Sequence, residues 1–174
     1  MELLNVKSVD KSYGGVIANH DVSLKVPKGK IVGIIGPNGS GKTTLFNSIV
    51  GHHPIDSGEI HFNGKEISSL TIPKIARLGM LRTFQQTHIY GKMTCVQNMQ
   101  ISSNIDADWK RVFNPFSKEV DEMVDELLSF VGLYKKRFLL AGDLSFGQQK
   151  LLEFAMALMK KPTILLLDEP TAGV

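Results

Sequence analysis

Residues 36–43 have the types and the spacing of a loop that binds phosphate. They are Gly36, Pro37, Asn38, Gly39, Ser40, Gly41, Lys42 and Thr43, which fit the pattern G-x-x-x-x-G-K-[ST] without a mismatch, and Thr44 follows. The glycines lack a Cβ, so the backbone can curl and turn successive N–H groups toward an anion. The Lys42 ammonium would neutralise β- and γ-phosphate oxygens, and the Thr43 hydroxyl would ligate Mg²⁺. The alternative is a glycine-rich turn that binds nothing.

Two acids at the end of an apolar run supply a second kind of chemistry. Asp168 and Glu169 directly follow the run 163–167, Thr-Ile-Leu-Leu-Leu. Because this run has no polar face, it predicts a strand buried on both sides, as in a parallel sheet. Asp168 would hold Mg²⁺ directly or through water, and Glu169 could accept a proton from an attacking water or orient it. Taken alone, the pair also fits a polar strand end that enters a loop.

A phosphate loop needs a strand before it and a helix after it. The run 31–35, Ile-Val-Gly-Ile-Ile, predicts a buried strand, and residues 42–50 predict a helix with Leu45 and Ile49 on one face. The positive end of that helix would point at the loop. The order of strand, glycine loop and helix therefore favours a phosphate cradle.

The remaining sequence divides into a strand-rich part and a helical part. Strands are predicted over residues 2–9, 21–26, 59–63 and 80–84, with turns at 11–15, 27–30, 56–58 and 63–64, and a short helix over 71–78. The opening hairpins favour antiparallel pairing. From about residue 88 the pattern is helical: Ser117 can cap one helix, and the last helix begins near Gly147 and stops at Pro162. An α/β fold with a helical insert over 88 to about 160 follows.

Length and composition describe an ordinary soluble globular chain. The 174 residues suffice for one domain, and the net charge of +3 is too small to indicate a nucleic acid or membrane surface as a partner. Cys95 is the single cysteine, so an intrachain disulfide is excluded and a reducing compartment is expected. The apolar runs are far shorter than a membrane span, and we expect no signal peptide in the first residues. We expect a cytosolic chain that could dock on a membrane partner.

Three further motifs give the sequence a specific resemblance. Leu-Ser-Phe-Gly-Gln at 144–148 opens a helix just before the acidic strand, Arg-Thr-Phe-Gln at 82–85 follows a predicted strand, and Tyr13 precedes the phosphate loop. With the phosphate loop and the acidic strand, these motifs resemble those of ATP-binding cassette (ABC) proteins over nearly the whole chain. The resemblance implies a P-loop NTPase (RecA-like) core over residues 1–87 and 162–174, with an N-terminal antiparallel β subdomain, and a helical subdomain over 88–161.

The resemblance also implies roles for individual residues. Tyr13 would stack on the adenine of ATP, and residues 36–44 would hold its phosphates. Thr43, Gln85 and Asp168 would hold Mg²⁺, while Lys42, Gln85 and Glu169 would carry ATP hydrolysis. Gln85 would also sense the γ-phosphate. Because it stands where the core meets the helical insert, it could couple the nucleotide to motion.

A second group of residues would act on a partner subunit's nucleotide. By resemblance, Leu144, Ser145, Phe146, Gly147 and Gln148 would grip the ATP bound to a second ATPase subunit, either identical or different. Ser145 and Gly147 also fit a plain helix N-cap, and Phe146 replaces the family's usual glycine. Closure of the two cassettes would drive transmembrane permease subunits, contacted through the helical subdomain. The chain would then be cytoplasmic and peripheral on the inner face of the membrane.

The sub-family can also be predicted. Residues 75–85, Ile-Ala-Arg-Leu-Gly-Met-Leu-Arg-Thr-Phe-Gln, are similar to ATPase subunits of branched-chain amino acid importers. The sequences at 144–149 and 168–173 agree with this. Related cassettes for urea or lipopolysaccharide share much of the pattern. A soluble ABC ATPase not tied to transport is a further alternative, although the DNA-repair kind would carry a coiled coil with a Cys-x-x-Cys, and the ribosomal kind usually has two cassettes.

The chain departs from the family after the acids. It ends at Val174, whereas the family continues for another third of the domain and places a γ-phosphate histidine there. All the histidines here precede the acidic strand; they are His20, His52, His53, His61 and His88. The missing third would include a central strand, and each buried ladder group left unpaired costs about 1–3 kcal/mol. We therefore expect this chain to be a fragment of a longer protein. A fragment that binds nucleotide without hydrolysing it is an open alternative.

Overall fold

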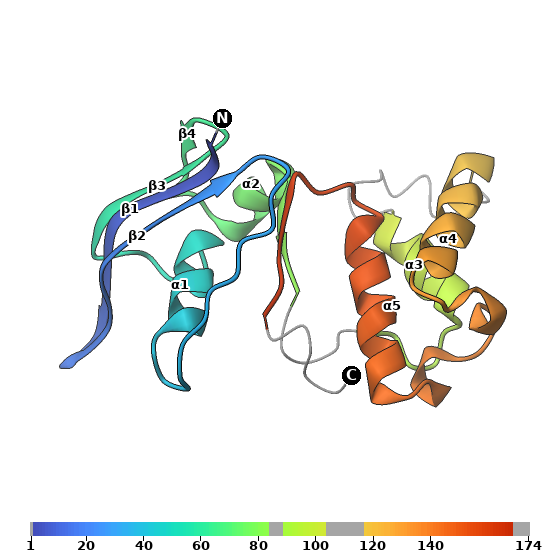
Figure 1. Ribbon diagram of the computed structural model, residues 1–174. Helices are drawn as coiled ribbons and strands as arrows, with labels where there is room; N and C mark the ends of the chain where they lie inside the picture. The colour runs from blue at the N-terminus through green and yellow to red at the C-terminus, as the bar shows by residue number, and fades with distance from the viewer. Residues whose placement is uncertain (1, 84–88, 104–116, 169–174) are drawn as a thin grey trace. The chain divides into compact units, whose positions relative to one another are not determined.

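The computed structural model describes residues 2–83, 89–103 and 117–168, and the chain separates into two compact units. The N-terminal unit comprises residues 1–80, and the C-terminal unit comprises residues 81–174. The described elements of the N-terminal unit are β1 (Glu2–Tyr13), β2 (Val16–Pro27), α1 (Lys42–Ile49), β3 (Ser57–Phe62), β4 (Lys65–Glu66) and α2 (Ile72–Arg77) (Figure 1).

The strands of this unit form one antiparallel sheet in the order β2-β1-β3-β4, so β1 lies between β2 and β3 (Figure 1). Its opening hairpin confirms the predicted strands, although the turn is tighter than expected. Residues 11–13 belong to β1, and the turn consists of Gly14 and Gly15, with φ 59° at Gly14. The second hairpin turn is as predicted, because Asn63 and Gly64 both have the positive φ angles that such a turn requires.

Apolar side chains of the sheet and of both helices are buried in the N-terminal unit. Those that are 2% exposed or less include Leu4, Val6, Val9, Ile49, Ile60, Phe62, Ile67 and Ile75. Val22, Leu24 and Val26 of β2 are half-buried and alternate with exposed residues, as the sequence predicts. Each large apolar side chain buried in this way contributes roughly 1.5–3 kcal/mol.

The predicted strand at residues 31–35 is wrong. The segment is assigned to no strand, and Ile31 and Ile35 are 103% and 98% exposed. Among residues 2–83, 89–103 and 117–168, none pairs with it in a sheet. An apolar run is a strand only where a neighbouring strand accepts its backbone hydrogen bonds, and the described part of the chain places no strand beside it.

The C-terminal unit joins a short sheet to a group of helices. Its elements are β5 (Met80–Arg82), which begins at the unit boundary, α3 (Cys95–Ser103), α4 (Lys118–Phe130), η2 (Tyr134–Lys136), η3 (Ala141–Asp143), α5 (Phe146–Leu158) and β6 (Ile164–Leu166). β5 and β6 form a two-stranded sheet. The predicted strand after Pro162 is therefore confirmed, but Ile164 and Leu165 are only half-buried, whereas the sequence predicted burial on both faces.

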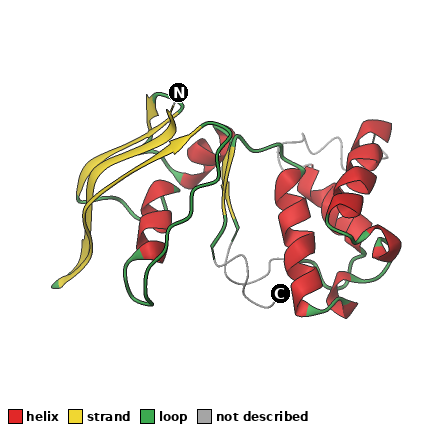
Figure 2. Cartoon of the chain, in the orientation of Figure 1, coloured by secondary structure: helices red, strands yellow, loops and turns green. Residues whose placement is uncertain are grey.

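Helices α3, α4 and α5 pack around a common core, as the periodicity of the sequence predicts (Figure 2). The buried members of this core are Cys95, Met99, Val124, Leu128, Leu133, Ala141, Leu144, Leu152, Ala155 and Met159. Asn98 is fully buried beside them, and its side-chain amide bonds to backbone groups of Tyr90, Met93 and Thr94. Over the described ranges, each helix is too short or too polar to cross a membrane.

Candidate functional site

The residues of the phosphate-loop motif form an exposed loop that leads into α1. Residues 37–40 are exposed and Gly36 is half-buried. The Ser40 N–H donates to the Pro37 carbonyl at 3.3 Å, which curls the loop. Helix α1 begins at Lys42, so the backbone N–H groups of its first turn, which lack partners within the helix, lie directly after the loop. This geometry is suited to an anion because those N–H groups and the helix dipole act together.

The Lys42 side chain folds back over the loop that precedes it. Its Nζ donates to the carbonyl oxygens of Gly36 and Pro37, at 2.7 Å each. An ammonium group has three donors, so a further one is available beside these two bonds. The positive charge therefore stays at the loop, where it can neutralise a phosphate oxygen.

Strand β2 holds the end of the phosphate loop. Gly41 has φ 83°, and a Cβ there would lie 2.1 Å from the Ala18 carbonyl oxygen and 2.7 Å from Asn19 Nδ2. Asn19 is 6% exposed, and its Nδ2 donates to the Gly41 carbonyl at 3.2 Å. By contrast, Gly39 has φ 80° and open space around its Cβ position. The sequence reasoning missed Asn19, since a polar residue within a strand carries no motif.

Tyr13 lies at the end of β1 and is 44% exposed. Lys11 Nζ lies 5.2 Å from the centroid of its ring, and the ring of His53 meets it edge-on at 5.7 Å. Lys11 is held in turn by Asp56, at 2.9 Å, and Asp56 also accepts hydrogen bonds from Ser12. The hydrogen bond from Lys11, followed by those from Ser12, lowers the pKa of Asp56 to about 2. The tyrosine is thus positioned at the surface by its neighbours.

The first of the two acids is paired with an arginine in the C-terminal unit. Arg82 Nη2 donates to Asp168 Oδ2 at 2.7 Å, and the two side chains are only 6% and 8% exposed. Arg82 is the last residue of β5, and Asp168 follows β6 by two residues. In the sequence, Arg82 stands out only as the first residue of the motif at 82–85. The partners are 86 positions apart in the sequence, so no local pattern shows the pair.

The signature-like motif begins α5 through a capping box. The Ser145 hydroxyl accepts a hydrogen bond from the Gln148 N–H at 3.4 Å, and Gln148 Oε1 accepts one from the Ser145 N–H at 3.2 Å. Leu144 is buried in the helical core, whereas Ser145 and Phe146 are exposed and Gly147 is half-buried. The plain N-cap anticipated from the sequence is therefore present. The hydroxyl and the helix N-terminus remain accessible to an anion.

The predicted Mg²⁺ ligands are only partly described. Thr43 is exposed at the start of α1, and Asp168 lies in the other unit, while Gln85 and Glu169 fall outside the described residues. A threonine hydroxyl and a carboxylate are hard oxygen donors, which suit Mg²⁺. Within the described part of the chain, no cluster of three or more His, Cys, Asp or Glu side chains could hold a metal. Mg²⁺ usually keeps several waters and is held by one or two carboxylates together with substrate phosphates.

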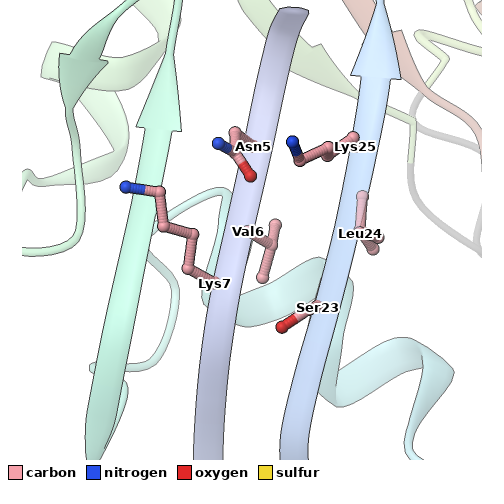
Figure 3. Close-up of a pocket in the computed structure, with 6 residues that line it drawn as sticks. All are labelled: Asn5, Val6, Lys7, Ser23, Leu24 and Lys25. Carbon is pink, nitrogen blue, oxygen red and sulfur yellow. The ribbon is translucent and has the colours of Figure 1, made fainter.

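A pocket on β1 and β2 lies elsewhere in the N-terminal unit. It is lined by Asn5, Val6, Lys7, Ser23, Leu24 and Lys25 (Figure 3). Its two lysines are already paired, Lys7 with Glu59 at 3.2 Å and Lys25 with Glu2 at 2.7 Å. Because acidic partners compensate both charges, this pocket is less suited to an anion than the phosphate loop is.

Comparison with known proteins shows that the chain belongs to a known family. A model of the ABC transporter family matches residues 19–172. The high-affinity branched-chain amino acid transport ATP-binding protein BraF of Pseudomonas aeruginosa is 38% identical, and the match covers 99% of this chain and 71% of BraF. The probable branched-chain amino acid transport ATP-binding protein LivG of Archaeoglobus fulgidus is 39% identical, with 100% of this chain and 70% of LivG covered.

Solved structures agree with these relatives. The ADP conformation of MJ1267, an ATP-binding cassette of an ABC transporter, superposes with a TM-score of 0.85 at 36% identity, and the match covers 100% of this chain and 71% of that one. CbiO1 of Clostridium perfringens, part of the ABC transporter complex cbiONQ, superposes with a TM-score of 0.83 at 28% identity. That match covers 99% of this chain and 67% of CbiO1. The α/β P-loop NTPase fold, with its antiparallel β subdomain and its helices, is thereby confirmed.

Proposed function

Since this chain belongs to the ABC transporter family, we propose that it is the ATP-binding part of an ATPase that powers an importer of branched-chain or other amino acids. The observation that carries the proposal is the phosphate loop, an exposed glycine turn with a lysine folded over it and a helix N-terminus behind it. The names of the relatives support amino acids as the transported substrate.

The triphosphate would be held by residues 36–44. Backbone N–H groups of the loop and of the first turn of α1 would bind the phosphate oxygens, because they have no partner within the helix. Lys42 would exchange its bonds to loop carbonyls for the β- and γ-phosphates. Tyr13 would stack on the adenine, a contact worth roughly 1–3 kcal/mol.

Hydrolysis would depend on the acids and on Gln85. Mg²⁺, held by Thr43, Asp168 and Gln85, would neutralise charge on the phosphates. Glu169 would accept a proton from the attacking water or orient it, and Gln85 would report the γ-phosphate to the helical part of the chain. These assignments rest on the motifs, since Gln85 and Glu169 lie outside the described residues.

The signature residues 144–148 would contact ATP on a second ATPase subunit. The accessible Ser145 hydroxyl and the N-terminus of α5 support this, because they are suited to a phosphate. A helical subdomain over residues 88–161, set into a core of 1–87 and 162–174, would contact the membrane permease subunits. The chain would then work on the cytoplasmic face of the membrane.

ATP turnover with Mg²⁺, measured beside a Glu169→Gln variant and an ATP-binding titration, tests the proposal. We expect the wild-type chain and the Glu169→Gln variant both to bind ATP. Any ATP turnover by the wild-type chain should disappear in the variant. Turnover that persists in the variant would contradict the role of Glu169. A failure of the wild-type chain to bind ATP would contradict the proposed function itself.

A further inference from the structure

The ion pair between Arg82 and Asp168 is buried and is fixed by two neighbouring strands. Arg82 Nη2 lies 2.7 Å from Asp168 Oδ2, with the side chains 6% and 8% exposed. Next to Arg82, the Thr83 N–H donates to the Leu166 carbonyl at 3.0 Å. This hydrogen bond joins the backbone next to Arg82 to the backbone just before Asp168. The guanidinium therefore meets the carboxylate in a defined geometry.

The pair uses only one of the two carboxylate oxygens. Within the described part of the chain, Asp168 Oδ1 accepts no hydrogen bond. A guanidinium is a planar and rigid donor, so it fixes the orientation of a carboxylate better than a flexible ammonium does. We propose that Arg82 is a positioning residue for the metal, which holds Asp168 by Oδ2 and leaves Oδ1 for Mg²⁺.

This role deepens the proposed function and rests on it, because it requires Asp168 to be a Mg²⁺ ligand. A purely structural clamp between β5 and β6 is the competing explanation. Buried ion pairs are a weak source of stability, and an apolar pair would join the strands equally well. Partners that orient metal-ligating carboxylates typically change metal affinity by about 10–100-fold when they are removed.

The test compares metal binding with nucleotide binding in Arg82→Gln and Arg82→Lys. Mn²⁺, a paramagnetic substitute for Mg²⁺, is titrated in the presence of ATP and followed by electron paramagnetic resonance. We expect Mn²⁺ affinity to fall by about 10–100-fold in Arg82→Gln and by less in Arg82→Lys, which keeps the charge but loses the planar fork. ATP affinity in EDTA should stay at the wild-type value, since the metal is absent.

Arg77→Gln is the matched control, because Arg77 is an exposed arginine at the end of α2. It should keep wild-type Mn²⁺ affinity. The double variant Arg82→Gln/Asp168→Asn should bind Mn²⁺ no more weakly than Asp168→Asn alone, since Arg82 acts through Asp168.

Wild-type Mn²⁺ affinity in the Arg82 variants, with lowered melting temperatures, would overturn the inference in favour of the clamp. If Arg82→Gln does not fold, the Mn²⁺ affinity of Arg82→Lys alone decides between the two explanations, because this variant keeps the charge of the pair. An equal loss of affinity in Arg77→Gln would also overturn the inference. If the wild-type chain binds ATP with an affinity that does not depend on a divalent metal, the role of Asp168 as a metal ligand is contradicted, and the role of Arg82 with it. An absence of ATP binding overturns the proposed function.

Discussion

The side-chain amide of Asn19 donates to the backbone carbonyl of Gly41 at 3.2 Å, which fastens the phosphate loop to strand β2. Asn19 is buried, and the Ala18 carbonyl closes the space where a Gly41 side chain would be. The position of the loop therefore depends on the antiparallel sheet as well as on the helix that follows.

Gly41→Ala should destabilise the chain more than Gly39→Ala does. Both positions have φ near 80°, which costs an alanine about 1–2 kcal/mol, but only the Gly41 methyl would meet backbone atoms. We expect Gly41→Ala to lower the free energy of unfolding by roughly 3 kcal/mol or more. Urea denaturation of the two variants measures the difference. Equal losses would show that the loop moves away from β2 without cost.

Lys42→Ala should weaken ATP binding and leave stability nearly unchanged. Its present partners are carbonyls of an exposed loop, which water can satisfy once the ammonium is removed. A charged hydrogen bond to phosphate contributes about 1.5–3 kcal/mol, so affinity should fall roughly 10–100-fold or more. Titration with ATP and thermal melting separate the two effects. Lys28→Ala, in an exposed turn, is the control and should bind ATP as the wild type does.

Ser145→Asp separates the capping role of Ser145 from its proposed role on a partner's ATP. Ser145→Ala removes the capping box and should cost about 1 kcal/mol. Aspartate caps helices as well as serine does, so Ser145→Asp should keep wild-type stability. Its charge would repel phosphate, and turnover of the paired subunits should fall roughly tenfold or more. Unchanged turnover in Ser145→Asp would leave Ser145 as a cap only.

The stability of the N-terminal unit should fall in acid through Asp10 and Asp56. The Ser57 hydrogen bond is the largest cause that lowers the pKa of Asp10, Lys11 has the same effect on Asp56, and both pKa values become about 2. Since the folded values lie below the ordinary 3.8, the stabilisation is complete above about pH 4 and is lost as pH falls through about 2.

The melting temperature of Asp56→Asn, measured from pH 7 to pH 2, checks this pH dependence. The variant should melt below the wild type at pH 7, and the difference should shrink as the wild-type carboxylate becomes protonated. Asp125→Asn, on the exposed face of α4, serves as the control. A difference that stays constant down to pH 2 would contradict the expectation.

Local patterns predicted much of the fold, because hairpins and amphipathic helices are encoded in neighbouring residues. The β1–β2 alternation and the periodicity of α4 and α5 are examples. The run 31–35 was predicted wrongly, since an apolar sequence favours burial but does not supply the strand that must pair with it. Asn19 and the Arg82–Asp168 pair could not be predicted, because each depends on a contact between residues distant in the sequence. The phosphate loop could be predicted from the sequence, because its chemistry lies within eight consecutive residues.

The exposed segment at residues 31–35 also affects how the protein behaves at high concentration. Ile31 and Ile35 are fully in water, and within the described chain the backbone between them belongs to no sheet. An uncharged stretch of β-forming residues with open backbone groups can pair with the same stretch of another copy. The segment that leads into the phosphate loop is therefore a solubility hazard, and a lysine in place of Ile31 would act as a gatekeeper against self-association.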